Sequence, residues 1–245
     1  MTCTAIGGIM DIGIGTDLVT LEPSMNIDKA LNVEELRGRF LKHTRLAYRR
    51  LPLLEQPRIL DIGCGPGQQT MELASLSGGE VVGIDTDSFA LSRLQKRIDH
   101  ANAGDRIKVI HVSFFDNTFD DDFFDIIWEE GVLHLLDASK SVAECRRLLK
   151  PNGYLVMHET TLWFESSQKK LQDFGFKLMH EHMLPKHFWW TNYGAPLEDR
   201  IKAFRDIHGD ASDSMKPTEY ESVVASIKND PDRTDCGIYI VKLIG

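Results

Sequence analysis

Three glycines at alternate positions, Gly63, Gly65 and Gly67, follow a short apolar run that carries Asp61 near its end. Glycines let the backbone turn tightly and let a ligand lie against bare main chain, so the segment predicts a nucleotide-binding turn. The spacing is G-x-G-x-G with Gln at position 68, whereas a dinucleotide fingerprint requires G-x-G-x-x-G. Asp61, two residues before the first glycine, is not part of the dinucleotide pattern either.

A second acid, Asp85, lies 24 residues after Asp61, at the end of another apolar run at residues 80–85. In Rossmann-like sites an acid in this position binds ribose hydroxyls, because a carboxylate accepts two hydrogen bonds from a diol. The alternative is that Asp85 caps a helix that begins near Ser88. Dinucleotide sites use this acid too, so Asp85 alone does not identify the ligand.

Side chains that can transfer protons follow two later apolar runs. Glu130 and His134 come after residues 124–128, and His158 and Glu159 end the run that starts at Tyr154. Histidines and carboxylates are the usual general acids and bases of enzymes. For both histidines the alternative is a structural hydrogen bond.

These candidates depend on alternating strands and helices. The pattern predicts strands at 59–62, 80–85, 107–112, 124–128, 154–158, 176–185 and 237–243, and helices at 69–77, 88–103 and 137–149. Such alternation favours an α/β fold with a parallel sheet covered by helices on both faces. The pattern fills the chain, so residues 1–245 are expected to form one domain, with 1–29 as an N-terminal arm.

Three segments resemble the successive signatures of the class I (Rossmann-like) S-adenosyl-L-methionine (AdoMet)-dependent methyltransferases. They are R-I-L-D-I-G-C-G-P-G-Q-Q-T at 58–70, F-D-I-I-W-E-E-G at 124–131 and R-L-L-K-P-N-G-Y-L at 147–155. The W-x-E-G sequence and residues 184–196 are similar to a subgroup of small-molecule-type enzymes. The resemblance covers about residues 30–245. It implies a seven-stranded, mostly parallel sheet, with the last strand antiparallel and inserted before the sixth.

The resemblance also implies roles for single residues. Ten would bind the cofactor: Asp61, Gly63, Cys64, Gly65, Gly67, Asp85, Thr86, Ser113, Phe114 and Glu129. Asp61 would lie close to the amino-acid portion of AdoMet, and Asp85 would hold the ribose. Thr86, Ser113 and the backbone N–H of Phe114 would lie near the adenine, with Asp116 as a rival to Ser113.

Methyl transfer from AdoMet is a direct displacement, so the enzyme mainly aligns the nucleophile, the methyl group and the sulfur. Glu129, Glu130 and Gly131 would border the methyl end of the cofactor. Glu130, His134 and His158 are the candidate catalytic residues. A general base is required only if the acceptor arrives protonated with a high pKa.

The acceptor pocket is expected at the ends of the fourth and fifth strands, under residues 186–196 or residues 24–50. The first segment contains Phe188, Trp189, Trp190 and Tyr193, which could contact an apolar acceptor or simply pack. Trp189 and Tyr193, four residues apart, would face the same side of a helix. The acceptor is expected to be a small molecule, since the chain lacks the Pro-Pro and Pro-Cys motifs of nucleic-acid methyltransferases. The alternatives are a non-catalytic AdoMet-binding regulatory subunit and a protein or nucleic-acid methyltransferase.

The amino-acid composition limits the classes of binding partner and the cellular compartment that we expect. With 37 acidic and 28 basic residues the net charge is −9, which disfavours nucleic acid as a partner. Four cysteines without a C-x-x-C motif predict neither disulfides nor zinc, and no apolar run suggests a membrane partner. We therefore expect a cytoplasmic protein. His180 and His182 share one face of a predicted strand, but a third ligand is not evident, so no metal is expected.

Residues 11–16, Asp-Ile-Gly-Ile-Gly-Thr, repeat the first half of the glycine pattern. The third glycine is missing, and Pro23 follows where a helix should run. This segment is interpreted as a flexible arm or a short hairpin.

Overall fold

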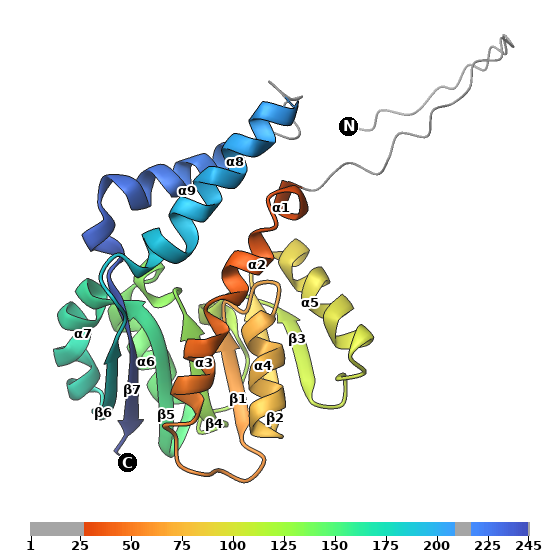
Figure 1. Cartoon of the computed structure of the whole chain (residues 1–245). Coiled ribbons are helices and arrows are strands. Elements are labelled where there is room, and N and C mark those ends of the chain that lie inside the picture. Colours follow the sequence, from red (N-terminus) through yellow and green to blue (C-terminus); the bar gives the residue numbers. More distant parts are fainter. Residues whose placement is uncertain (1–26, 209–216, 245) are drawn as a thin grey trace, which may run out of the picture.

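The computed structural model describes residues 27–208 and 217–244 (Figure 1). A seven-stranded sheet has the order β3-β2-β1-β4-β5-β7-β6. Its strands are β1 (Arg58–Ile62), β2 (Glu80–Asp85), β3 (Ile107–His111), β4 (Phe124–Glu130), β5 (Leu149–Thr160), β6 (Phe176–Met183) and β7 (Cys236–Leu243). Only β7 pairs antiparallel, with β5 and β6. The predicted fold and the inserted last strand are confirmed.

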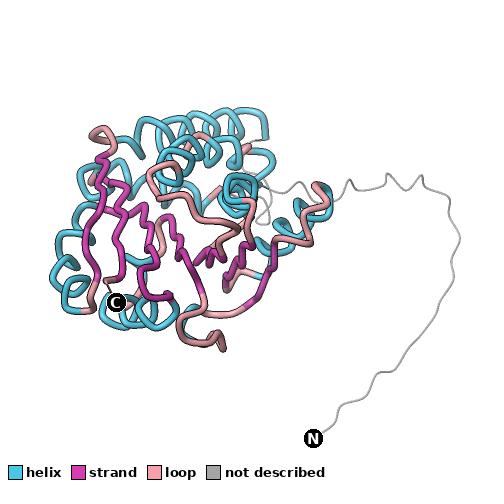
Figure 2. The backbone as a smooth tube through the Cα atoms, turned by 90° about the horizontal axis from the view of Figure 1, so that it is seen from below, coloured by secondary structure: helices cyan, strands magenta, loops and turns pink. Residues whose placement is uncertain are grey.

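The sheet has a core on each face because successive side chains of a strand point to opposite sides. In β1, Leu60 and Ile62 pack against α6 (Ala138–Leu148) and α7 (Thr161–Asp173). Ile59 packs on the other face with α3 (Leu41–Tyr48), α4 (Gln68–Ser77) and α5 (Ser88–His100). Figure 2 shows the strands as a twisted layer between these helices.

A third apolar cluster lies beyond the carboxyl ends of the parallel strands. It joins the short helices α1 (Ile27–Ala30) and α2 (Val33–Gly38) to α8 (Ala195–His208) and α9 (Thr218–Asn229). These four helices are called the helical cap below. Figure 1 shows the cap above the end of the sheet where the glycine-rich turn lies.

The predicted element bounds agree with the structure to within a few residues, with one exception. β5 begins at Leu149 and runs through residues 151–153, whereas the sequence predicted this strand only at 154–158. The pairing with β4 is irregular there, jumping from Leu149 to Tyr154, and Asn152 has a φ of 67°. The Asp-Ile-Gly segment at 11–16 lies outside the described residues. Of the expected N-terminal arm, residues 27–29 belong to α1.

Candidate active site

The three glycines of the loop after β1 all have positive φ, but a side chain at each would meet different surroundings. A Cβ on Gly63 would lie 2.4 Å from Val132 Cγ2, and one on Gly67 would lie 2.1 Å from Leu94 Cδ1. A Cβ on Gly65 would meet nothing within 4 Å. Gly63 and Gly67 therefore permit close packing, whereas Gly65 presents bare backbone to open space.

The two acids of the motif differ in their surroundings. Asp61 is buried and accepts a hydrogen bond of 2.6 Å from Thr70 Oγ1. Burial raises the pKa of Asp61 to about 7. Its side chain supports α4 from beneath the loop and is absent from the cavity walls described below.

Asp85 holds the glycine loop directly. Its Oδ2 accepts from Gly65 N at 2.8 Å, and its Oδ1 accepts from Asp87 N at 2.9 Å. The cap of α5 is Asp87, whose Oδ1 accepts from the N–H groups of Phe89 and Ala90. The helix-cap alternative for Asp85 is therefore wrong.

Against this loop lies a cavity of about 260 Å³, called the donor cavity below. Residues from the loop, from the start of α4, from α2 and from the ends of β4 and β5 surround it. They are Arg37, Phe40, Gly63, Cys64, Gly65, Pro66, Gln68, Gln69, Glu130, Gly131, Val132, His158 and Trp189.

The three residues expected near an adenine lie beside Asp85, at the ends of β2 and β3. The Val112 N–H donates to the Asp85 carbonyl at 3.1 Å, which brings the following residues next to β2. Thr86 is exposed, and Ser113 Oγ accepts from Phe115 N at the start of η1 (Phe114–Asp116). The Phe114 ring is buried in the core. The walls of the donor cavity do not extend to these three residues.

The paired glutamates after β4 point in different directions. Glu129 is fully buried and accepts from the N–H groups of Val132 and Leu133. Burial and the neighbouring charge of Glu159 raise its pKa well above the usual value. Glu129 therefore holds the turn after β4 rather than lining a cavity.

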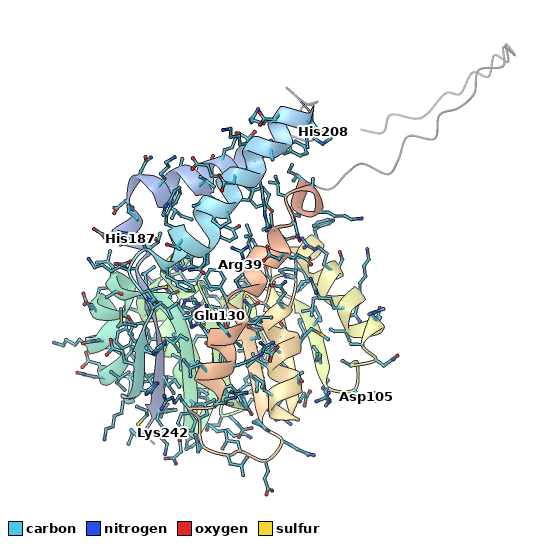
Figure 3. All side chains as sticks on the ribbon, in the orientation of Figure 1. Arg39, Asp105, Glu130, His187, His208 and Lys242 are labelled. Atoms are coloured by element: carbon cyan, nitrogen blue, oxygen red, sulfur yellow. The ribbon has the colours of Figure 1, made fainter. Side chains whose placement is uncertain are left out.

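Glu130 lies beneath the helical cap, whereas Asp105 and Lys242 mark the opposite end of the sheet (Figure 3). Its Oε1 accepts from Thr44 Oγ1 at 2.7 Å and from Trp128 Nε1 at 3.0 Å, and Gln69 Nε2 donates to Oε2 at 3.2 Å. Burial alone would raise the pKa of Glu130, but the neighbouring His158 and the hydrogen bonds from Thr44 and Trp128 lower it. The carboxylate is thus held in its charged form.

His158 is buried between aromatic rings, with centroids 6.1 Å from Phe40 and 6.3 Å from Trp189. Its Nε2 lies 3.3 Å from Cys236 Sγ, and its Nδ1 lies 3.9 Å from Glu130 Oε2. Although burial lowers the pKa of His158, these two partners raise it to about 10.

His134, in η2 (Leu133–Leu135), pairs with the buried Glu159. Its Nδ1 lies 3.0 Å from both carboxylate oxygens, and its backbone N–H donates to Oε1 at 3.0 Å. The Thr160 N–H donates to Oε2 at 3.0 Å. The hydrogen bond that His134 donates to Glu159 raises the pKa of His134, although burial opposes this.

A second cavity of about 290 Å³ adjoins the first and is called the acceptor cavity below. Both cavities share a wall made by Glu130, Gly131, His158 and Trp189. The remaining wall of the acceptor cavity consists of His134, Glu159, Thr160, Thr234 and Cys236. The three candidate catalytic residues thus meet at one place, where two ligands could face each other.

The aromatic segment divides its side chains between the cavities and the cap. Trp189 lines both cavities, and its ring lies 4.5 Å from that of Phe40. Tyr193 makes an edge contact with Trp189 at 5.6 Å but is buried in the apolar cluster of the cap. Of the pair expected to contact an acceptor, only Trp189 reaches a cavity.

Neither of the paired strand histidines gathers further ligands. The His182 ring lies 6.4 Å from the ring of His43 on α3. Burial and the charge of Lys42 lower the pKa of His43 to about 4. Within residues 27–208 and 217–244 there is no group of three or more His, Cys, Asp or Glu suited to a metal ion.

Several residues of the site were not singled out by any motif. Arg37 and Phe40 line the donor cavity and Thr44 donates to Glu130; all three lie within the segment 24–50 that was expected to cover the site, but the sequence did not identify them individually. Cys236 is the first residue of β7, and Thr234 ends the short helix η5 (Pro231–Thr234) just before it. Gln69 could have been found, since it directly follows the glycine loop on the first turn of α4.

Residues 60–157 match the family model described as "Methyltransferase domain". The chain is 34% identical over 182 residues to the uncharacterized methyltransferase YodH of Bacillus subtilis, covering 70% of this chain and 76% of YodH. It is 29% identical over 136 residues to 27-O-demethylrifamycin SV methyltransferase of Amycolatopsis mediterranei, covering 55% of this chain and 49% of that protein. The matches with this enzyme and with an uncharacterized Haemophilus influenzae protein span about half of those relatives' length.

Among solved structures, the [4+2]-cyclase SpnF superposes with a TM-score of 0.69 at 18% identity, covering 82% of this chain and 79% of SpnF. That likeness shows the fold alone, because one fold can host different reactions. The sequence relatives and the site motifs make the narrower assignment: the chain belongs to the class I AdoMet-dependent methyltransferases. No helix in the described part of the chain is long and apolar enough to cross a membrane.

Proposed function

We propose that the protein transfers a methyl group from AdoMet to a small-molecule acceptor by direct displacement. The observation that carries this proposal is the pair of adjoining cavities with a common wall at Glu130, Gly131, His158 and Trp189. One cavity adjoins the glycine loop, and the other adjoins the His134–Glu159 pair. Direct displacement requires that donor and acceptor meet without an intervening group.

The residues around the donor cavity fit the cofactor. Gly65 offers backbone with free space above it, and Asp85 fixes that backbone. We expect the Asp85 carboxylate also to hold the ribose, as the acid after the second strand of a Rossmann-like fold does. Thr86, Ser113 and Phe114 would border the adenine. When bound, AdoMet supplies a methyl group activated by a sulfonium.

The candidate catalytic residues have distinct tasks. Glu130, held anionic by Thr44 and Trp128, attracts a cationic ligand to the common wall. His158 positions Glu130 and packs against Trp189. Glu129 and Asp61 act indirectly, by holding the turn after β4 and the start of α4.

We further propose a single domain that works in the cytoplasm without nucleic-acid or membrane partners. The net charge of −9 supports the exclusion of nucleic-acid partners. Cys64, Cys145 and Cys236 are buried free thiols, which suits a reducing compartment.

Calorimetry tests the donor assignment. We expect AdoMet and S-adenosylhomocysteine to bind and NAD not to bind. Asp85→Ala should weaken AdoMet binding by roughly 1–3 kcal/mol, because a charged acceptor and a loop anchor are both lost. Tight NAD binding without AdoMet binding would contradict the proposal. AdoMet binding without formation of S-adenosylhomocysteine from any metabolite would favour the regulatory alternative.

A further inference from the structure

We infer that His134, positioned by Glu159, is the general base of this site and that the methyl acceptor is a phenol-type hydroxyl on an apolar scaffold. This inference rests on the proposed methyl transfer and names the chemistry of its acceptor. It selects one of the candidate catalytic residues as the group that receives a proton.

The hydrogen bonds around Glu159 fix the tautomer of His134. The carboxylate already accepts from the backbone N–H groups of His134 and Thr160. Its contact with Nδ1 at 3.0 Å therefore requires that Nδ1 carries a hydrogen. The neutral imidazole then has its lone pair on Nε2, the arrangement in which a carboxylate–histidine pair takes up a proton.

The His134 ring lines the acceptor cavity close to the place where the cavities meet. A Cβ on Gly131 would lie 4.0 Å from His134 Cε1, the ring atom between Nδ1 and Nε2. Gly131 belongs to the common wall of the two cavities. The His134 side chain keeps 36% of its surface exposed, while Glu159 is completely covered. The base is thus open to an acceptor, and the group that orients it is shielded.

The other candidates are less suited to receive a proton. Both ring nitrogens of His158 face protein partners, Cys236 and Glu130. Glu130 accepts three hydrogen bonds, from Thr44, Trp128 and Gln69. A carboxylate stabilised in this way is a weak base.

The walls of the acceptor cavity favour a neutral, apolar acceptor. No Lys or Arg occurs among the described residues that line it, and the charge of His158 is paired with Glu130, so an anionic substrate finds no unpaired cationic partner there. Trp189 offers an aromatic surface for stacking. Leu135 and Leu162, each close in sequence to a cavity-lining residue, are 73% and 64% exposed. An apolar scaffold larger than the cavity could extend over them.

A phenol requires the base that His134 provides. Its pKa is near 10, so little of it is ionised at neutral pH. In the step, the O–H bond breaks and the proton moves to Nε2 of His134. The oxygen forms a bond to the methyl carbon, and the carbon–sulfur bond of AdoMet breaks with its electron pair left on sulfur. The products are a methyl ether, S-adenosylhomocysteine and a protonated His134, which returns its proton to water.

Two acceptors that differ in acidity test the assignment. The first is 2-naphthol, which is protonated at about pH 8, and the second is an electron-poor nitrophenol, which is already ionised there. His134→Gln should lower kcat/KM for 2-naphthol by roughly 10²–10⁴-fold and for the nitrophenol by less than about 10-fold. His100→Gln, which removes an exposed histidine at the end of α5, is the matched control and should change neither rate. Equal losses with both acceptors would overturn the assignment of His134 as base.

Glu159→Gln tests the positioning role. The rate with 2-naphthol should rise with pH as His134 loses its proton, and the raised pKa places this rise above the ordinary histidine value of about 6.5. In Glu159→Gln the rise should move to lower pH, because the charge that favours imidazolium is gone. A loss of rate without any movement of this rise would mean that Glu159 is only structural.

A measurement without cofactor is independent of turnover. In donor-free protein, ¹⁵N NMR of His134 should show Nδ1 protonated and Nε2 as the acceptor nitrogen, and the pKa should fall in Glu159→Gln. The opposite tautomer would overturn the inference. If AdoMet binds and amines or thiols are methylated but no phenol is, this inference fails while the proposed function stands. If AdoMet does not bind, the proposed function itself fails.

Discussion

At the scale of single residues, the glycines of the loop show that one motif can contain two kinds of requirement. Gly63 and Gly67 are needed because Val132 and Leu94 occupy the space of a side chain. At Gly65 no neighbour occupies that space, so beyond its left-handed backbone a side chain is excluded only if a ligand lies above it. This difference can be tested, because Gly78 has a similar left-handed backbone conformation but does not line the donor cavity.

Gly65→Val should abolish AdoMet binding, since the side chain would enter the donor cavity. Gly78→Val is the matched control: both glycines have positive φ, and a Cβ on either meets nothing within 4 Å. Each substitution should cost about 1–2 kcal/mol of folding stability from the left-handed backbone. Calorimetry and thermal unfolding separate the two effects. Similar loss of AdoMet binding in both variants would show that backbone strain, not ligand volume, is responsible.

Asp61 should influence stability more than binding. Its folded-state pKa of about 7 lies above the unfolded value, so its contribution to stability is fully present at acid pH and is lost as pH rises through about 7. Asp61→Asn keeps an oxygen for Thr70 and removes the charge. The free energy of unfolding, measured with urea between about pH 4 and pH 8, should therefore fall less steeply in the variant. AdoMet affinity should change by less than about 3-fold. A larger loss would indicate that Asp61 contacts the cofactor directly, as the family resemblance implies.

Some residues of the site could be predicted together with their partners because local geometry fixes them. Gly65 and Asp85 are joined by a hydrogen bond across 20 residues, within one βαβ unit whose spacing is regular. The partner of Glu130, by contrast, is Thr44, 86 residues away on a helix that precedes the sheet. No spacing rule links these two positions, because their contact depends on how α3 packs.

At the scale of elements, the strands were predictable because the sheet is buried on both faces. Apolar runs such as residues 80–85 and 237–243 have nearly the bounds of β2 and β7. Helices α8 and α9 were not predicted. Their apolar side chains pack against α1 and α2 rather than the sheet, so the βα alternation carries no information about them.

The segment before α8 contains neighbouring aromatic residues with different tasks. Trp189→Ala should raise the KM for the acceptor by roughly 3–10-fold, the value of an aromatic contact, and should change AdoMet affinity less. Tyr193→Ala should instead destabilise the fold by about 3–5 kcal/mol, because the ring is buried in the cap. Kinetics and urea unfolding distinguish the two. Tyr193→Phe, the matched control, should preserve packing and acceptor use, and a raised KM in it would contradict a purely structural role.

At the scale of the whole molecule, polar contacts add to the apolar cluster in joining the helical cap to the layers beneath it. Arg93 on α5 pairs with Asp28 at 2.6 Å and with Glu34, and Arg97 also pairs with Glu34. The Glu34 carbonyl accepts from Gln68 Nε2 at 2.8 Å, directly after the glycine loop. The cap is thus connected to the helix that begins at the donor cavity. The family resemblance implied the strand order but not this layer.

These contacts predict that Glu34 couples cap closure to donor binding. Although burial opposes it, hydrogen bonds from Arg93 and Arg97 lower the pKa of Glu34. The contribution of these ion pairs to folding stability is therefore present at neutral pH. It is lost as the pH falls below the pKa of about 4.5 that Glu34 has in the unfolded chain. Glu34→Gln should increase hydrogen exchange in α1 and α2 and accelerate AdoMet dissociation at neutral pH, while exchange in β1 and β4 stays unchanged.

Glu198→Gln is the matched control for this prediction, because Glu198 pairs with Lys228 between α8 and α9, within the cap itself. It removes a similar charge without touching α5 or the glycine loop. We expect it to leave AdoMet dissociation at the parental rate. If Glu34→Gln and Glu198→Gln accelerate dissociation equally, net charge is responsible. If neither does, the cap closes over the donor cavity through its apolar cluster alone, and the ion pairs of Glu34 only add to surface stability, where exposed pairs contribute little.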